Sequence, residues 1–410
     1  YYTIKQLWSP IQIMNTSIDR QFDGKFSVEN RYDYLNLNTC RFLWKQVKFP
    51  QATDASNTAA QVLKEGEVQG SDVAAHSAGV LDIKTNILAN TDALYLTAID
   101  KYGHELWRWT FPVDKLNQQT EPISLLSIRP TYTETENDLT VKANKRTFIF
   151  SKKDGQLKGV SVDNRKISFA NGPRFIGARR ADRSLDQFYN HDDEKAKEKD
   201  RTYSEFPDAA VFTKLDVKQD GGDLIVTANY KLGNLDKAQW TISPSGDLVL
   251  DYTYNFSGVV DLMGICFDYP EDQVISKRWL GAGPYRVWQN RIHGTQYDVW
   301  ENDYNDPIPG ETFTYPEFKG YFGDVSWMNI RTKEGIISLT NETPDAYVGV
   351  YQPRDGRDRL LYTLPESGIS LLNVIPPVRN KVNSTDLCGP SSQPKWVNGP
   401  QTGRIVFRFI

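Results

Sequence analysis

Apolar and polar residues alternate along most of this chain with a period of two residues. In "DLVLDYTYNF", residues 247–256, every second residue from Leu248 to Phe256 is apolar, and polar residues stand between most of them. The C-terminal "RIVFRFI", residues 404–410, repeats the pattern. This period is that of a β-strand with one buried and one exposed face. We therefore expect both segments to be half-buried strands.

Further runs alternate in the same way between Gly, Asn or Asp turn signals. They are "GKFSVENRYDYL" (24–35), "CRFLWKQVKF" (40–49), "DALYLTAID" (92–100), "ELWRWTF" (105–111), "RTFIFSKKDGQLKGVSV" (146–162) and "DLIVTANYKL" (223–232). Only "DDEKAKEKD", residues 192–200, has the composition of a helix or a solvated loop. No rhythm of strand, helix and strand is present, so the sequence predicts an all-β fold and disfavours parallel α/β folds.

The polar segment "DKLNQQTEPISLLSIRP", residues 114–130, is closed by prolines and flanked by strand runs. It is the best candidate for a domain boundary, which we place near residue 128. Residues 1–128 have the length and strand count of an immunoglobulin-like β-sandwich. Residues 129–410 are long enough for a large sandwich of many antiparallel strands.

Composition describes an ordinary globular protein, with 39% hydrophobic and 24% charged residues in 410. The formal net charge of -4 and the lack of a polybasic run give no reason to expect a nucleic-acid partner. No apolar run approaches the roughly 20 residues that a membrane span needs. The chain opens on Tyr1 without a signal-peptide pattern, which is typical of a fragment or a mature form.

Metal-ligand spacing is lacking, and the sequence predicts no cofactor. Three cysteines and four histidines are scattered: Cys40, Cys266, Cys388, His76, His104, His191 and His293. The acidic stretch between Asp182 and Glu194 is either a solvated loop or a Ca²⁺ site without EF-hand spacing.

The segment "WLGAGPYRVWQNR", residues 279–291, has the residue types of a binding site. A phosphate loop is disfavoured, because no helical pattern follows the glycines. A sugar-binding rim fits better, since aromatic rings stack on sugars while Arg, Asn and Gln bond hydroxyls. An ordinary bend between buried strands explains the aromatic residues equally well.

A second motif, "SLTNE" at residues 338–342, is similar to the stretch that carries the acid/base glutamate in many retaining glycosidases. That glutamate lies at the end of a barrel strand, and a second carboxylate must lie about 5 Å away. Glu342 stands between strand runs without a following helical pattern. We expect it to be a turn residue.

Several motifs in order resemble glycoside hydrolase family 2 β-galactosidases beyond their catalytic barrel. The opening "YYTIKQLWSPIQI" and the run that follows it resemble the start of the fourth domain, with matches at Asn30, Tyr32, Asn36, Leu37 and Trp44. "RTFIFSKKDGQLKGVSVDNRKI" resembles the opening of the fifth domain, a β-supersandwich related in shape to galactose mutarotase. "WLGAGPYRVWQNR" and "YPEFKGYFGDVSWMNI" follow later motifs of that domain, retaining Gly281, Gly283, Pro284, Arg291, Pro316, Gly320, Asp324, Val325 and Trp327.

The framework residues match this family, whereas the polar residues that would contact the sugar differ. The family has Glu-Asn-Tyr where this chain has Arg286, Val287 and Trp288, and Lys319 stands in the next motif. Replacing a carboxylate by arginine favours an anionic group. We therefore expect that the sugar specificity has diverged from galactose, toward an acidic or decorated sugar.

The resemblance implies a non-catalytic C-terminal region that completes the carbohydrate pocket of a parent glycosidase and stabilises its assembly. The catalytic glutamates would lie on the parent's barrel, so no catalytic residue and no activity of this part alone are expected. "LCGPSSQPKWVNGP" loosely resembles the segment that lines the sugar site in this family. The candidate carbohydrate-binding residues are Tyr285, Arg286, Trp288, Arg291, Glu317 and Trp396.

Two other readings stay open. A stand-alone carbohydrate-binding module would need Trp288, Trp300, Trp327 or Trp396 to stack on sugar without a barrel. A mutarotase-like epimerase would need a histidine and a carboxylate acting together, for which His293 with Glu301 or Glu317 is the one loose option. The expected partners are a carbohydrate and the parent's barrel, and a homo-oligomer stays open. The compartment is also open, being periplasmic or extracellular if the parent carries a signal peptide.

Overall fold

The protein is represented by a computed structural model that describes residues 1–54, 58–114, 128–180, 203–206, 209–303, 320–350, 365, 367–377 and 389–410. The chain divides into two compact units. The first comprises residues 1–118, 280–284 and 292–300, and the second comprises residues 119–279, 285–291 and 301–410. Strands dominate the described part, so the all-β prediction is confirmed. No described helix is both long and apolar enough to span a membrane.

The boundary predicted near residue 128 lies beside residues 115–127, which are outside the described part. It stays a prediction. The segments 280–284 and 292–300 cluster with the first unit although they are distant from it in the chain. A division made in chain order cannot anticipate such segments.

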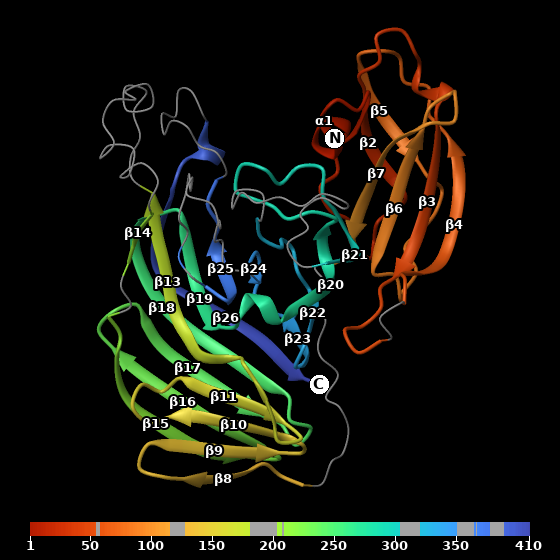
Figure 1. Ribbon diagram of the computed structural model, residues 1–410. Coiled ribbons are helices and arrows are strands. Elements are labelled where there is room, and N and C mark those ends of the chain that lie inside the picture. The colour runs from red at the N-terminus through yellow and green to blue at the C-terminus, as the bar shows by residue number, and fades with distance from the viewer. Residues whose placement is uncertain are drawn as a thin grey trace, which may run out of the picture. The chain divides into compact units, whose positions relative to one another are not determined.

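The first unit is an antiparallel sandwich. Its described strands form a three-stranded sheet in the order β1-β2-β5 and a four-stranded sheet in the order β4-β3-β6-β7 (Figure 1). The bounds are β1 Ile11–Ile13, β2 Lys25–Asn30, β3 Arg41–Lys48, β4 Gln61–Gln69, β5 Ser77–Asp82, β6 Ala93–Ile99 and β7 Glu105–Pro112. A single core cluster contains residues from both sheets, including Phe26 and Phe42. Two sheets and seven strands agree with the immunoglobulin-like prediction.

Two short helices accompany these strands. Helix α1 spans Tyr2–Leu7 and the 3-10 helix η1 spans Leu37–Thr39. The extended chain begins at β1, after Pro10, and the segment Tyr2–Leu7 before it is helical. The residue before a proline is biased away from the helical region, so Pro10 separates the helix from the strand.

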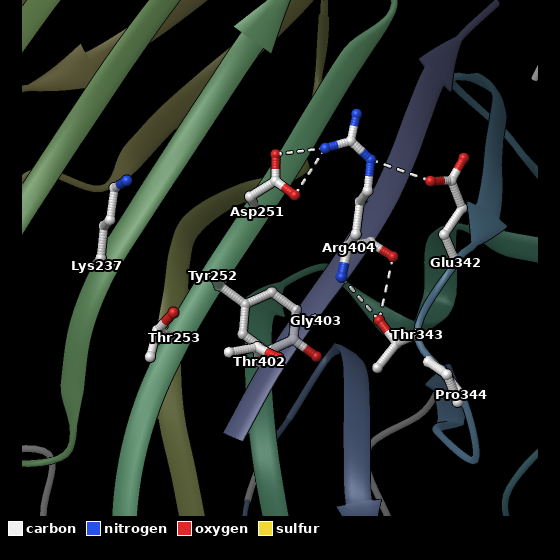
Figure 2. A pocket seen from close by; sticks show the side chains of 10 residues that line it. All are labelled: Lys237, Asp251, Tyr252, Thr253, Glu342, Thr343, Pro344, Thr402, Gly403 and Arg404. Atoms are coloured by element: carbon white, nitrogen blue, oxygen red, sulfur yellow. Dashed lines mark hydrogen bonds and ion pairs between the residues drawn. The ribbon is translucent and has the colours of Figure 1, made fainter. Parts of the chain in front are cut away.

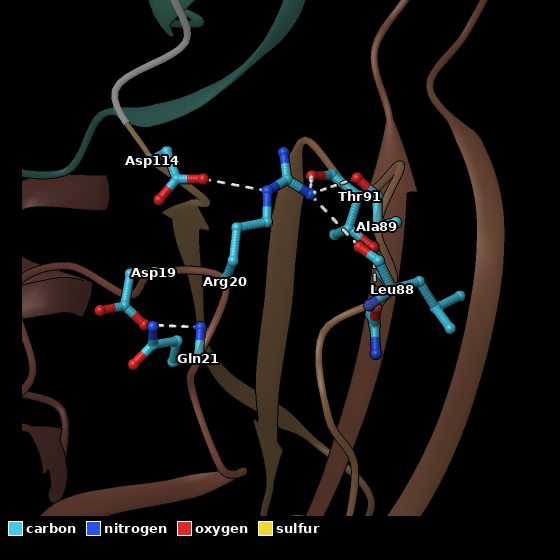
Figure 3. A network of polar contacts seen from close by, with 8 residues as sticks. Asp19, Arg20, Gln21, Leu88, Ala89, Thr91 and Asp114 are labelled. Atoms are coloured by element: carbon cyan, nitrogen blue, oxygen red, sulfur yellow. Dashed lines mark hydrogen bonds and ion pairs between the residues drawn. The ribbon is translucent and has the colours of Figure 1, made fainter.

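Polar contacts hold the loop between β5 and β6 from both sides. Gln46 is fully buried, donates to the Asn86 carbonyl at 2.8 Å, and accepts from the Leu88 amide at 2.8 Å and the Thr91 hydroxyl at 2.7 Å. From the other side, Arg20 donates to carbonyls of the same loop and pairs with Asp114 at 2.9 Å (Figure 3). A buried amide is tolerated when its donors and acceptors are satisfied, so Gln46 specifies the path of this loop.

Replacing Gln46 by Leu leaves the buried partners of the amide without hydrogen bonds. We expect Gln46→Leu to lower the free energy of unfolding of the first unit by about 3 kcal/mol. Gln61→Leu, on the exposed face of β4, is the matched control and is expected to change it by less than about 0.5 kcal/mol. Urea titration of both variants measures the difference, and equal stabilities would contradict this role for Gln46.

Two large antiparallel sheets consist mainly of residues of the second unit. The ten-stranded sheet has the order β24-β25-β19-β13-β11-β10-β9-β8, with β12 paired to β11 and β14 to β13. The nine-stranded sheet has the order β15-β16-β17-β18-β26-β23-β22-β20-β21. Figure 1 shows β15 to β18 side by side.

Strands of the ten-stranded sheet are β8 Thr131–Glu134, β9 Asp138–Ala143, β10 Arg146–Ser151, β11 Leu157–Val162, β12 Arg165–Ile167, β13 Ala170–Arg180, β14 Tyr203–Glu205, β19 Leu262–Asp268, β24 Tyr347–Val350 and β25 Ile369–Val374. Those of the nine-stranded sheet are β15 Val211–Asp220, β16 Asp223–Lys231, β17 Leu235–Ile242, β18 Leu248–Val260, β20 Val274–Gly283, β21 Gln296–Asp303, β22 Trp327–Thr332, β23 Gly335–Asn341 and β26 Lys395–Phe409. The 3-10 helices η2, Glu271–Gln273, and η4, Pro390–Ser392, lie between strands.

The two segments that opened the sequence analysis pair with each other. Strand β18 runs antiparallel to β26, from Leu248 opposite Phe407 to Val260 opposite Lys395. Alternate residues of β18 from Leu248 to Phe256 are buried, and the residues between them are partly exposed. The period-two prediction is confirmed for β18, and in β26 the expected residues Ile405, Phe407 and Phe409 are buried, together with Val406 between them.

Aromatic side chains from both sheets meet in the core of the second unit. The ring of Phe169 lies 4.6 Å from that of Phe267 on β19, and 5.1 and 5.3 Å from those of Phe407 and Phe409 on β26. All four side chains are fully buried. Because β19 and β26 belong to different sheets, this cluster joins the two layers of the sandwich.

Truncating the central ring of this cluster creates a cavity between the layers. We expect Phe169→Ala to destabilise the second unit by about 3 to 5 kcal/mol. Tyr132→Ala, which removes an aromatic ring that is 47% exposed on β8, serves as the control with little expected change. Chemical denaturation followed by tryptophan fluorescence compares the variants, and a loss below about 1 kcal/mol for Phe169→Ala would refute the central position of this ring.

An ion pair closes the β13–β19 ladder near its end. Arg174 lies 2.6 Å from Asp268, and Asn171 donates to the same carboxylate at 2.7 Å. Burial alone would raise the pKa of Asp268, but the hydrogen bonds from Arg174 and Asn171 outweigh it and hold the pKa below its usual value. Such a carboxylate stabilises the fold above its unfolded pKa of about 3.9, and this contribution is lost as the pH falls through the lower folded value.

The pH dependence of Asp268→Asn tests this assignment. We expect the wild type to be modestly more stable than the variant above about pH 5, because the pair is partly exposed. The advantage should fade as the pH drops below about 4, where the carboxylate is protonated. Free energies of unfolding measured from neutral to acid pH check this, and a difference that stays constant at low pH would rule it out.

Candidate functional site

The segment 285–291 forms a tight turn in the second unit rather than a phosphate loop. Trp288 and Arg291 exchange two backbone hydrogen bonds, of 3.3 and 2.9 Å, across this turn. Val287 bonds in the same way with Tyr321, at 2.7 and 2.8 Å. Gly320 has a positive φ of 47°, and a Cβ there would lie 2.9 Å from the Cβ of Arg286. The close approach of the two chains explains why a glycine stands in the second motif.

Trp288 lies in the core beneath this turn. It is 3% exposed, and its ring meets that of Tyr321 edge-on at 5.5 Å. The surrounding cluster includes Ile176 from β13 and Leu372 from β25. A ring buried in this way anchors the turn to the ten-stranded sheet and presents no face on which a sugar could stack. Direct contact between Trp288 and a sugar therefore stays a prediction. The burial of the Trp288 ring does not favour it.

The two arginines of the turn have different surroundings. Arg286 is 4% exposed, and its guanidinium lies 5.8 Å from the ring centre of Phe322. Lys277, on β20, is fully buried and approaches the same ring to 5.7 Å. Arg291 is exposed and Tyr285 is half-buried. Arg291 is thus the cation of this turn that a dissolved ligand can reach, whereas Arg286 is part of the interior.

The turn also holds the start of β26. Gln289 donates through its side chain to the Gln393 carbonyl at 2.7 Å, and its backbone amide donates to the Pro376 carbonyl at 3.1 Å. Three residues after Gln393, the side chain of Trp396 is 70% exposed. The fold therefore brings the predicted turn next to the segment that carries the predicted tryptophan, although about a hundred residues separate them in the sequence.

Some predicted positions lie outside the described residues. These are Glu317, Lys319 and the acidic stretch between Asp182 and Glu194. Among the residues that the structure does describe, no group of three or more His, Cys, Asp or Glu side chains is arranged to hold a metal ion.

Sequence reasoning missed Lys277, which contributes to the same interior as Arg286. Lysine is rarely fully buried, so its residue type did not suggest an interior position. Nearly all of β20 is buried, so its two faces are not distinguished by a polar and an apolar side. The apolar residues Trp279 and Leu280 that follow shortly after it were the only local signal.

Comparison with solved structures found similar chains of low identity. A galactose 1-epimerase from Lactobacillus acidophilus NCFM has a TM-score of 0.41 and 11% identity, and the match covers 69% of this chain and 99% of that one. An uncharacterized protein, lmo2446, from Listeria monocytogenes EGD-e has a TM-score of 0.21 and 9% identity, with 98% of this chain and 30% of that chain covered. No curated protein matched the sequence.

Comparison with protein families is more specific. Residues 142–374, more than half of the chain, match the family model described as the beta galactosidase small chain. The matched range includes most strands of the second unit and the whole turn at residues 285–291. This agrees with the family resemblance that the motifs indicated. The chain belongs to the beta-galactosidase small-chain family.

Proposed function

We propose that this chain is the non-catalytic C-terminal region of a β-galactosidase-like glycoside hydrolase family 2 enzyme, and that it completes the sugar pocket of the parent enzyme. The family match over residues 142–374 supports the placement in such an enzyme. The observation that carries the binding role is the exposed indole of Trp396, on a segment held beside the turn by Gln289. An exposed tryptophan next to polar side chains is the usual composition of a sugar rim.

Within this rim, each side chain has a role that its exposure permits. Trp396 stacks on a sugar face, while Arg291 and the half-buried Tyr285 supply hydrogen bonds. Arg286 and Lys277 lie in the interior, beside the ring of Phe322. The exposed Arg291 favours sugars that carry an anionic group over neutral galactosides. Glu317 remains a proposed contact.

A stand-alone carbohydrate-binding module is the second candidate, because the Trp396 ring is exposed within this chain itself. The two functions differ in what the isolated chain does. A module binds oligosaccharides by itself with useful affinity, whereas a pocket-completing region contributes mainly when the parent's barrel is present. Neither function predicts hydrolysis of a glycoside by the isolated chain.

Kinetics of the parent enzyme test the proposal. In the polypeptide that carries the barrel, we expect Trp396→Ala to raise KM about tenfold or more. The reason is that stacking of one aromatic ring on a sugar is worth about 1 to 2 kcal/mol of binding free energy. The isolated chain should not cleave nitrophenyl glycosides. An unchanged KM in the variant, or hydrolysis by the isolated chain, would contradict the proposal. Tight binding of sugars by the isolated chain would favour the module instead.

A pair of tryptophan variants separates the rim from the core. Trp288→Ala should lower the stability of the second unit by about 3 to 5 kcal/mol, because a buried ring is lost. Trp396→Ala should change stability by less than about 0.5 kcal/mol, because its ring is exposed. Thermal or urea unfolding of both variants provides the readout. The assignment is wrong if Trp396→Ala proves to be the more destabilising change.

A further inference from the structure

A cavity of about 350 Å³ lies on the nine-stranded sheet of the second unit. Its lining comes from β17, β18, β26 and the turn after β23 (Figure 2). The lining residues are Lys237, Asp251, Tyr252, Thr253, Glu342, Thr343, Pro344, Thr402, Gly403 and Arg404. None of the candidate rim residues belongs to it. Along β26, Arg404 stands eight residues beyond Trp396, which corresponds to about 27 Å of strand.

Strand register places the polar side chains of this cavity in a grid. Lys237 pairs with Thr253, and Thr253 pairs with Thr402, so these three residues form one row across β17, β18 and β26. Asp251 pairs with Arg404 in the next row. Directly paired residues of an antiparallel sheet point to the same face, with neighbouring strands about 4.8 Å apart and successive rows about 6.8 Å apart.

Arg404 organises the second row. Its Nη1 donates to both oxygens of Asp251, at 2.8 and 2.7 Å, and its Nε donates to Glu342 at 3.0 Å. Figure 2 shows the guanidinium between the two carboxylates. Lys237 and Arg404 balance Asp251 and Glu342, so the four charged side chains sum to zero. A lining with balanced charge does not favour an ion of either sign.

Hydrogen-bonding groups remain available within this balanced lining. In the described part of the chain, no side-chain hydrogen bond is found for Lys237, Thr253 or Thr402, and Nη2 of Arg404 likewise lacks a partner. These groups combine donors with hydroxyls that both donate and accept. A ligand with several closely spaced hydroxyl groups matches such a grid.

Tyr252 also lines this cavity. It is 2% exposed and stands opposite Gly403, whose lack of a side chain leaves room for the tyrosine ring. Its hydroxyl makes no hydrogen bond of regular geometry with the described residues. Burial raises the pKa of Tyr252 to about 12, and the neighbouring Thr343 hydroxyl partly offsets that rise. Tyr252 alternates with Asp251 and Thr253 along β18, so its ring points to the buried face and closes the floor of the cavity instead of bonding a ligand above the threonines.

We propose that this cavity binds a neutral sugar, whose hydroxyl groups bond Thr253, Thr402 and the free side of Arg404. The site is separate from the Trp396 rim and does not depend on the function proposed for that rim. It is a binding site without acid/base chemistry of its own, because both carboxylates are held by the arginine. The glycosidase-like motif that contains Glu342 thus contributes a side chain that orients Arg404.

Binding by the intact chain tests this site, with methyl β-galactoside, methyl β-glucoside and methyl α-mannoside as separate probes. Saturation-transfer NMR detects contact, and titration calorimetry measures affinity. The double variant Thr253→Val and Thr402→Val removes two hydroxyls while keeping β-branched side chains that suit strands. Thr241→Val, on β17 outside the cavity lining, is the matched control. Lys237→Gln offers a second test at an exposed position, where a substitution leaves folding intact.

The wild type should bind at least one neutral glycoside, and the double variant should bind it about tenfold more weakly. Lys237→Gln should also weaken binding, while Thr241→Val and the rim variant Arg291→Gln should bind as the wild type does. The proposal is overturned if no neutral glycoside binds, or if the double variant binds normally. It is equally overturned if Arg291→Gln abolishes the binding, which would place the ligand at the rim, or if galacturonate binds more tightly than galactoside.

Discussion

The contact on which the second unit depends is the aromatic packing between its two sheets. Phe169 touches rings from both layers, and every ring of this group is fully buried. Burial of large apolar side chains is the dominant favourable term in folding. The same packing fixes which face of β18 and β26 is internal, and hence which of their side chains remain outside for hydrogen bonding.

Burial also divides the aromatic residues of the candidate rim into two kinds. Trp288 is an anchor that holds the turn against the ten-stranded sheet, whereas Trp396 is exposed on the neighbouring segment. The hydrogen bond from Gln289 to Gln393 links the two. An anchored turn provides a rigid support for an exposed ring, which lowers the entropic cost of ordering a binding surface.

Electrostatics separate the two proposed sugar sites of the second unit. The proposed rim lies on a turn whose exposed cation is Arg291, while Arg286 and Lys277 are buried. The cavity on the nine-stranded sheet has two cations balanced by two carboxylates around Arg404. We therefore propose an anionic sugar for the rim, where Arg291 is available, and a neutral sugar for the cavity, where the charges cancel.

The sequence alone determined the all-β fold, the inward faces of β18 and β26, and the family, because period-two alternation and short framework motifs are local properties of the chain. It also identified the turn at residues 285–291. Only the tertiary structure decided that Trp288 is buried while Trp396 is exposed, and that Asp251, Glu342 and Arg404 meet in one cavity. Those outcomes depend on strand pairings between distant residues, and alternation specifies two faces without specifying which strand lies alongside.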